Sequence, residues 1–250
     1  MSCLTTNMID MTNDIITSTK PTVSDDAAVH AAIDAAPLPA DDPRRWFAHA
    51  VATAGATIAS VADDQFTLST PCTDYDVRGM LGHLVAVMHR VAIVGAGGSP
   101  FEVPQVVELG ADATVSDWSA AWSDAAHRVQ DVWTAEVLDH LITLPWAQLP
   151  GRVTMAIYTN EVTVHTWDLA TATGQSPSWH QPTLAKAFEA IRIGLPAEGR
   201  TASFDAPIAQ IDESVRDEAV HEGAPFAEVV EVPVDAPLID RLVAWNGRRP

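Results

Sequence analysis

The window between Gly151 and Gly174 contains no proline or glycine, and it constrains the fold more than any other stretch of the chain. Its length and the apolar spacing of Val153, Ile157 and Val164 predict a helix of about five or six turns. A glycine directly after such a run is typical of a helix C-terminus. The sequence therefore predicts one long helix that ends at Gly174.

Glu161 and His165 lie in this helix four residues apart, so both side chains leave the same face one turn apart. The neighbouring positions on that face are mostly apolar: Ile157, Tyr158, Val162 and Leu169. A carboxylate among apolar groups is unfavourable unless a metal ion, another cation or exposure to solvent compensates its charge. The alternative is an exposed pair of side chains, which contributes only about 0.2–0.5 kcal/mol.

Residues 70–84 predict a loop, an N-cap and the start of another helix. Thr73 or Asp74 is the expected N-cap, and Asp76 adds negative charge to the first turn, where the helix dipole favours it. An apolar stripe at helical spacing marks the face toward the core: Leu81, Leu84, Val85 and Met88.

His83 lies on another side of this second helix, between Met80 and Val87, and is therefore also held among apolar groups. Together, His83, Glu161 and His165 make the two-histidine, one-glutamate ligand set of catalytic zinc sites with an open coordination position. The alternative is that His83 is a core histidine hydrogen-bonded to a backbone carbonyl. The residues by themselves leave both interpretations open.

Two motifs, TPCTDYDVRGMLGHL at 70–84 and EVTVHTWDLATATG at 161–174, carry a family resemblance, and VPVDAPLIDRLVAWNGRRP at 232–250 adds to it. The chain resembles the DinB-like metal-binding superfamily. Within that superfamily it is most similar to the N-terminal domain of mycothiol-dependent maleylpyruvate isomerase and its relatives. The likeness extends over roughly residues 41–250, about the coverage of a whole domain.

In that family, a histidine of the second helix and an E-x-x-x-H pair of a later helix bind a divalent metal. The resemblance therefore implies these metal ligands: His83, Glu161 and His165. Asp168, which lies nearly one turn beyond His165, is a candidate to hydrogen-bond and orient a ligand histidine. Equally, Asp168 could pair with Arg78 or Arg90 on a neighbouring helix.

The expected fold class is all-α: a DinB-like four-helix bundle with a long crossover and a short C-terminal helical extension. Residues 1–40 are expected to be a flexible N-terminal extension with one short helix at 26–36. Residues 41–250 would be the bundle domain, with 176–250 as its helical appendage. The expected helices run from Pro43 to about Ala62, from Thr73 or Asp74 to about Gly95, from Ser116 onward, from Gly151 to Gly174, from about Pro182 to Leu195, and from Ala236 to Trp245.

Between these helices, residues 99–114 form a long loop that is a candidate lid or pocket wall, and 138–153 form a crossover that could include a short strand. Aromatic and aliphatic residues are interpreted as core packing rather than as an aromatic pocket. The expected inward-facing positions are Trp46, Ala50, Val51 and Ile58 in the first helix, and Trp118, Trp122, Val129 and Val132 or Trp133 in the third. The remaining histidines match no motif and are expected to be surface or packing residues: His30, His49, His89, His127, His140, His180 and His221.

The 33 acidic residues against 14 basic ones give a formal net charge of −19. A field of this sign repels phosphate backbones and anionic membranes, so neither nucleic acid nor a membrane is an expected partner. We expect no secretory signal and no membrane-spanning run, and two cysteines, Cys3 and Cys72, fit a reduced, cytoplasmic setting. Cys72 is interpreted as a small buried loop residue rather than as a fourth metal ligand or a reactive thiol.

The resemblance implies a divalent-metal enzyme that acts on a small electrophilic metabolite, either as a thiol S-transferase or as an isomerase, with mycothiol or another low-molecular-weight thiol as cofactor. Zinc is the expected metal, and nickel, iron and manganese suit the same ligands. One alternative is a metal-dependent hydrolase, lyase or cyclase of a specialised pathway. Another is a non-catalytic protein that binds a metal or a small molecule. A homodimer is compatible with the sequence, which does not define the oligomeric state.

Overall fold

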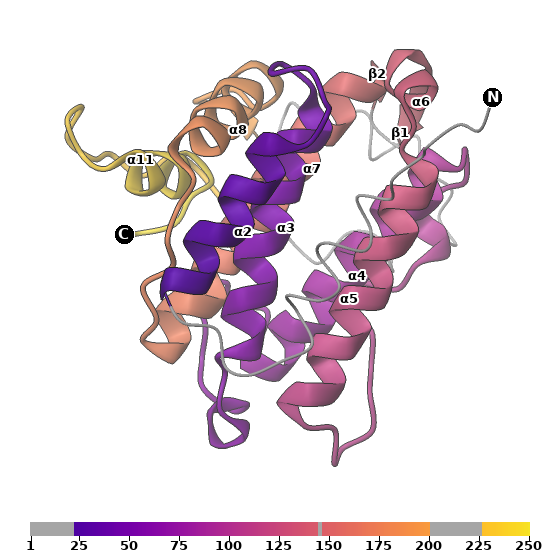
Figure 1. The fold of residues 1–250 in the computed structure, drawn as a ribbon. Coiled ribbons are helices and arrows are strands. Elements are labelled where there is room, and N and C mark those ends of the chain that lie inside the picture. Colours follow the sequence, from indigo (N-terminus) through magenta and orange to yellow (C-terminus); the bar gives the residue numbers. More distant parts are fainter. Residues whose placement is uncertain (1–22, 145–146, 201–226) are drawn as a thin grey trace.

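The computed structural model describes residues 23–144, 147–200 and 227–250 (Figure 1). Four long helices form its body: α3 (Pro43–Ala59), α4 (Val77–Gly95), α5 (Val115–Val132) and α7 (Gly151–Thr173). Each packs against two others, because α3 contacts α5 and α7, and α4 contacts the same two helices. The predicted all-α fold, a four-helix bundle, is confirmed.

The crossover from α5 to α7 contains more regular structure than the sequence predicts. A short helix, α6 (Ala135–Asp139), is followed by two antiparallel strands, β1 (Leu141–Leu144) and β2 (Ala147–Pro150). Leu141 lies opposite Pro150, and Leu144 lies opposite Ala147. The single short strand that was expected at 138–153 is therefore one half of a hairpin.

Three further helices lie around the bundle: α2 (Val23–Ala35), α8 (Gln181–Gly194) and α11 (Leu238–Trp245). Helix α8 contacts α3, α7 and α11, and a small apolar cluster fills the space between α7, α8 and α11. This cluster consists of Val164, Leu184, Ala187, Leu242 and Val243. The C-terminal helices thus pack directly on the helix that carries Glu161 and His165.

Helix α2 corresponds to the short helix expected at 26–36, and buried contacts hold it against α3. The guanidinium group of Arg45 on α3 donates to the carbonyl oxygens of Ile33, Asp34, Ala36 and Leu38. This fixes the C-terminal end of α2 and the turn that follows. Residues 1–22 of the expected N-terminal extension lie outside the described residues, and the domain limits remain a prediction.

Helix α4 begins later than predicted, because its N-cap is Asp76. The Asp76 carboxylate accepts a hydrogen bond from the backbone N–H of Gly79 at 2.8 Å. The expected caps, Thr73 and Asp74, instead lie in a turn that the Thr70 hydroxyl holds through two loop carbonyl oxygens. The local sequence does not show which of several neighbouring polar residues caps the helix. The hydrogen bonds of Thr70 decide it here, because they hold Thr73 and Asp74 in the preceding turn.

The N-cap of α5 is Thr114 rather than the expected Ser116. Its backbone N–H donates to the Asp117 carboxylate at 2.8 Å, which forms a capping box over residues 114–117. The aromatic residues of α5 pack as predicted, since Trp118, Trp122 and Trp133 are all at least 97% buried. They belong to the main core.

The buried face of α3 is displaced from the predicted one. Ala50 and Ile58 are buried as expected, but Trp46 and Val51 are only half-buried, and Phe47 is buried instead. Trp46 lies at the edge of the bundle facing α8, where the Lys186 ammonium is 5.4 Å from its ring centroid. Phe47 instead belongs to the main core of the bundle.

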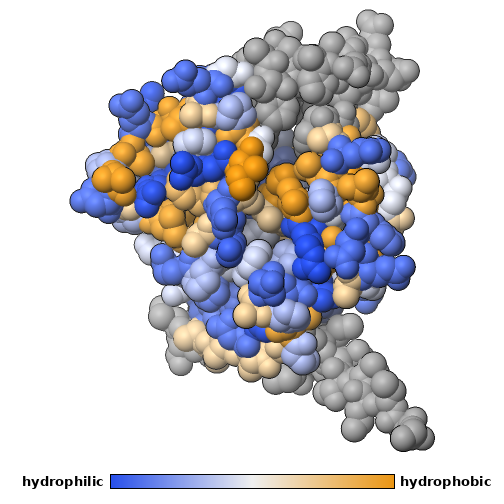
Figure 2. Space-filling view, turned by 90° about the horizontal axis from the view of Figure 1, so that it is seen from above, coloured by the Kyte–Doolittle hydropathy of each residue, from blue (hydrophilic) through white to orange (hydrophobic). Residues whose placement is uncertain are grey.

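Helix α4 is long and apolar enough to cross a membrane by length and composition, but 78% of its apolar window is buried inside the protein. It is therefore the central core helix of the bundle. Large exposed apolar residues are scattered over several elements: Leu68, Leu141, Val153, Ile193 and Val234. On the face seen in Figure 2, hydrophobic residues lie in small groups between hydrophilic ones.

The loop expected to be a lid or wall, residues 99–114, lies directly against α4. It includes a 3-10 turn, η2 (Pro100–Glu102), and the Val107 N–H donates to the Gly82 carbonyl at 3.1 Å. Gly82 permits this approach, because a Cβ there would meet the Val107 carbonyl oxygen at 2.4 Å and Val106 Cγ1 at 2.6 Å. The loop is therefore a fixed wall beside His83, the next residue of α4.

Replacing Gly82 with Ala should destabilise the fold by about 1–3 kcal/mol, because the added methyl group must displace backbone atoms of the 99–114 loop. Gly194→Ala is the matched control, since a Cβ at this helical glycine meets nothing within 4 Å. It should leave stability unchanged or raise it by up to about 1 kcal/mol. Urea unfolding measures both, and equal free energies of unfolding would contradict this account of the loop.

Candidate metal centre

The three predicted ligands are brought together where α4 faces α7. His83 comes from α4, and Glu161 and His165 come from consecutive turns of α7. One donor atom from each of the three residues lies within 4.8 Å of the other two. The imidazole rings of His83 and His165 meet edge to face, with their centroids 4.6 Å apart. The spacing predicted from the sequence is therefore realised, while the metal assignment itself remains a prediction.

His83 is oriented by the loop wall, and only 6% of its surface is exposed. Its Nδ1 lies 2.9 Å from the Gln105 carbonyl oxygen, so Nδ1 carries the proton and Nε2 is left with a free lone pair. Burial, followed by the charges of His165 and Arg90, lowers the pKa of His83 well below its ordinary value. The ring is thus neutral at physiological pH, which is the form that coordinates a metal.

His165 is oriented by a carboxylate of its own helix. Its Nδ1 lies 3.1 Å from Asp168 Oδ2, and this contact leaves Nε2 as the nitrogen available to a ligand. The predicted hydrogen bond between Asp168 and a candidate ligand histidine is therefore present. The alternative partners Arg78 and Arg90 are wrong, because Asp168 pairs with Arg248 instead.

The Asp168–Arg248 pair joins α7 to the end of the chain. Arg248 donates through Nε at 3.0 Å to Oδ1 and through Nη2 at 2.9 Å to Oδ2, so both carboxylate oxygens are engaged. Burial alone would raise the pKa of Asp168, but the hydrogen bonds and charges of His165 and Arg248 lower it overall. The carboxylate is fully buried and ionised, and it fixes the orientation of His165.

Cys72 and Tyr75 complete the surroundings of the cluster. Cys72, a free thiol, lies within 4.8 Å of donor atoms of His165 and Asp168, and burial raises its pKa. The Tyr75 ring stacks on His83 with centroids 4.8 Å apart, and burial raises its pKa to about 12. Both side chains are therefore protonated at neutral pH. Cys72 is partly buried, in keeping with a packing residue of the loop.

Three of the site's supporting contacts were not found from the sequence: the Gln105 carbonyl, the Tyr75 ring and the Arg248 guanidinium. Gln105 and Arg248 lie 22 and 80 residues from the groups that they contact, and no periodic pattern relates them. The only available signal was the basic end of the chain, Arg248 and Arg249, within the third segment of the resemblance. The contact between Asp168 on α7 and Arg248 is known only from the tertiary structure.

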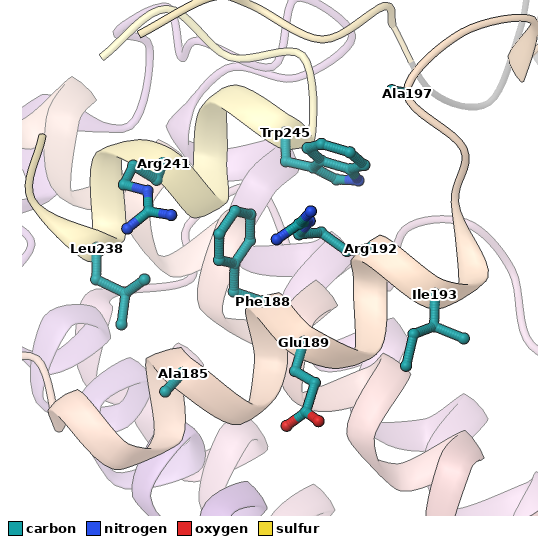
Figure 3. Close-up of a pocket in the computed structure, with 9 residues that line it drawn as sticks. All are labelled: Ala185, Phe188, Glu189, Arg192, Ile193, Ala197, Leu238, Arg241 and Trp245. Carbon is teal, nitrogen blue, oxygen red and sulfur yellow. The ribbon is translucent and has the colours of Figure 1, made fainter. Parts of the chain in front are cut away.

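A separate cavity of about 480 Å³ opens between α8 and α11 (Figure 3). The Arg192 guanidinium lies between two aromatic rings, 5.6 Å from the Phe188 centroid and 5.3 Å from the Trp245 centroid. All its lining residues come from 185–197 and 238–245, so it shares none with the metal-ligand cluster.

Residues 47–170 match the family model described as the mycothiol maleylpyruvate isomerase N-terminal domain. This part of the chain belongs to that family. The family domain contains all three predicted ligands, and it excludes α2, α8 and α11. The resemblance inferred from the two motifs is confirmed over these residues.

The chain is similar to two uncharacterized proteins, MT0763 and Rv0738, from two strains of Mycobacterium tuberculosis. Each is 28% identical over 194 residues, which cover 77% of this chain and 90% of the relative. Among solved structures, it is similar to a histidine-to-alanine mutant of mycothiol-dependent maleylpyruvate isomerase. That similarity has 15% identity and a TM-score of 0.46, and it covers 64% of this chain and 69% of the other.

Asp168→Asn should destabilise the protein by about 3 kcal/mol, because it leaves the buried Arg248 charge without a counter-ion. Asp139→Asn is the control, since the Asp139–Arg152 pair is exposed on both sides and should contribute less than about 1 kcal/mol. Chemical unfolding at neutral pH measures the two variants. A loss no larger for Asp168→Asn than for the control would refute the role of the buried pair.

The free energy of unfolding that Asp168→Asn loses should also depend on pH, and the direction of this dependence follows from the pKa of Asp168. The folded-state pKa of Asp168 lies below the ordinary value of 3.8, so its stabilising contribution is complete above that pH and is lost as the pH falls through the folded-state pKa. The deficit of Asp168→Asn should therefore shrink in acid. A deficit that stays constant from pH 7 to below pH 3 would contradict this assignment.

Proposed function

We propose that this chain is a divalent-metal-dependent enzyme that acts with a low-molecular-weight thiol, such as mycothiol, on a small electrophilic metabolite. The reaction would be S-transfer or thiol-assisted isomerisation, and the setting would be the cytoplasm. The observation that carries the proposal is the convergence of His83, Glu161 and His165 within a domain of the mycothiol maleylpyruvate isomerase N-terminal family.

The residues present suit a divalent ion. His83 and His165 each have Nδ1 held by a protein oxygen, so Nε2 of each ring would bind the ion together with a Glu161 carboxylate oxygen. Two neutral imidazoles and one carboxylate favour zinc, with nickel, iron and manganese also suited. When bound, such an ion lowers the pKa of a coordinated thiol and polarises a carbonyl group.

The reacting thiol would come from a small molecule rather than from the described part of the chain. Cys72 is the cysteine beside the cluster, but its raised pKa keeps it in the unreactive thiol form at neutral pH. Cys3 lies outside the described residues. Cys72 would therefore act as a wall of the site, and a cofactor thiol would supply the nucleophile.

A buried cation beside the cluster supports an anionic substrate. Arg90 is only 8% exposed, and its guanidinium donates to the Pro104 carbonyl and the Gln105 amide oxygen, both of which are neutral. Among the described residues, no carboxylate lies within ion-pairing distance of Arg90. Its positive charge would favour a thiolate or a carboxylate-bearing electrophile next to His83.

Metal analysis tests the first half of the proposal. The parent should retain near-stoichiometric divalent metal at this cluster, and His83→Ala and His165→Ala should each lose one equivalent, since two remaining ligands hold the ion weakly. His127→Ala, a change at a half-buried histidine of α5, is the control and should match the parent. If both ligand variants retain as much metal as the control after dialysis, the metal assignment is wrong.

Thiol-dependent turnover tests the second half. With mycothiol present, the metal-loaded parent should convert carboxylate-bearing unsaturated electrophiles, with net loss of free thiol in S-transfer and with the thiol regenerated in isomerisation, and Glu161→Gln should lower the rate by about 100-fold or more. Free-thiol titration follows S-transfer and chromatography of the electrophile follows isomerisation, with the Cys72→Ser variant as the control that should stay active. Activity without thiol would favour a hydrolase, lyase or cyclase, and tight metal binding without any turnover would favour a binding protein.

A further inference from the structure

Three of the histidines expected to be surface or packing residues lie together where α2, α3 and the start of α8 meet. His30 is on α2, His49 is on α3, and His180 directly precedes α8. The ring centroids of His49 and His180 are 3.6 Å apart, and those of His30 and His49 are 4.9 Å apart. Figure 1 shows α2 lying along α3 on the side of the bundle that carries α8.

A carboxylate faces two of these rings. Asp34 Oδ1 lies 3.0 Å from His49 Nε2, and Asp34 Oδ2 lies 3.8 Å from His180 Nε2. One donor atom from each of these three residues lies within 4.8 Å of the other two. His49 is fully buried, whereas the Asp34 side chain is 54% exposed and free to adjust.

The opposite nitrogen of each ring is held by another side chain. His49 Nδ1 lies 2.7 Å from His30 Nδ1, and His180 Nδ1 lies 2.9 Å from Thr183 Oγ1. Both Nε2 atoms are therefore directed at the same carboxylate while both Nδ1 atoms have a partner. This is the arrangement of metal-bound histidines, in which a hydrogen bond at one ring nitrogen orients the other toward the ion.

We propose that Asp34, His49 and His180 form a second divalent-metal site, with zinc as the best-suited ion, and that this site ties α2 to α3 and to the start of α8. Its ligand set resembles that of the first cluster, with two histidines and one carboxylate. The Asp34 oxygens already lie 3.0 and 3.8 Å from the two Nε2 atoms, close to the spacing of donors in a tetrahedral zinc site, so the adjustment on binding falls on the rings. The His49 and His180 rings are stacked at an interplanar angle of 18°, and both Nε2 lone pairs reach one ion only when the His180 ring, which is 18% exposed, turns out of the stack.

The site is independent of the proposed thiol chemistry. Asp34 and His180 lie outside residues 47–170, the part that matches the family, and none of the three ligands belongs to the first cluster. The ion would stabilise the packing of the peripheral helices and would take no part in a reaction. Its loss should therefore leave the first cluster's metal in place.

The test is zinc content after loading and desalting, compared between His180→Gln and His140→Gln in the full chain. His140 is the matched control, because it is an exposed histidine 3.7 Å from the Glu136 carboxylate and thus a histidine–carboxylate pair without further ligands. We expect His180→Gln to bind about one zinc equivalent fewer than His140→Gln, whether or not the first cluster is loaded. Equal zinc content in the two variants would overturn the proposal.

Thermal unfolding gives a second readout. Saturating zinc, at about 100 times the dissociation constant, should raise the melting temperature of a His83→Ala/His165→Ala variant by roughly 5–10 °C, because only the second site remains. Adding Asp34→Asn, a surface change that preserves shape, should abolish that rise. If His180→Gln does not fold, the test is the zinc-induced rise in melting temperature with and without Asp34→Asn. A rise that Asp34→Asn leaves undiminished would refute the site.

Discussion

The buried pair between Asp168 and Arg248 is the interaction on which the arrangement of the site depends. Asp168 is fully buried on α7, and its two oxygens are shared between the Arg248 guanidinium and Nδ1 of His165. A buried carboxylate of this kind is tolerated only while its partners are in place. The orientation of a candidate metal ligand therefore depends on a residue at the very end of the described chain.

A second buried contact fixes the same two segments. The side-chain amides of Asn160 on α7 and Asn246 after α11 donate to each other's oxygens, both at 3.0 Å. The apolar cluster between α7, α8 and α11 adds non-directional attraction to these directional contacts. The C-terminal helices, which lie beyond the family match, are thus part of the structure that positions Glu161 and His165.

The molecule combines two clusters that follow the same chemical rule. In both, two histidines lie beside a carboxylate, and hydrogen bonds hold their Nδ1 atoms. They differ in their surroundings. The first lies beside the buried Arg90 and the loop wall, whereas the second lies beside the half-exposed Asp34, where α2, α3 and the start of α8 meet.

The sequence by itself determined the helices and the first cluster. Helix periodicity and the terminal glycine placed α7 correctly, and Glu161 and His165 share a face because they are one turn apart on a single helix. These are local consequences of backbone geometry. The motif around His83 supplied the third residue through resemblance, and α4 and α7 did bring it to the other two.

Only the tertiary structure decided which cap residues start α4 and α5, which arginine pairs with Asp168, and that His30, His49 and His180 form a cluster at all. Asp34, His49 and His180 lie on three different elements, and no spacing rule relates residues that are brought together by helix packing. A local pattern fixes the direction of a side chain relative to its own helix. The neighbours it meets there are set by the way distant segments pack.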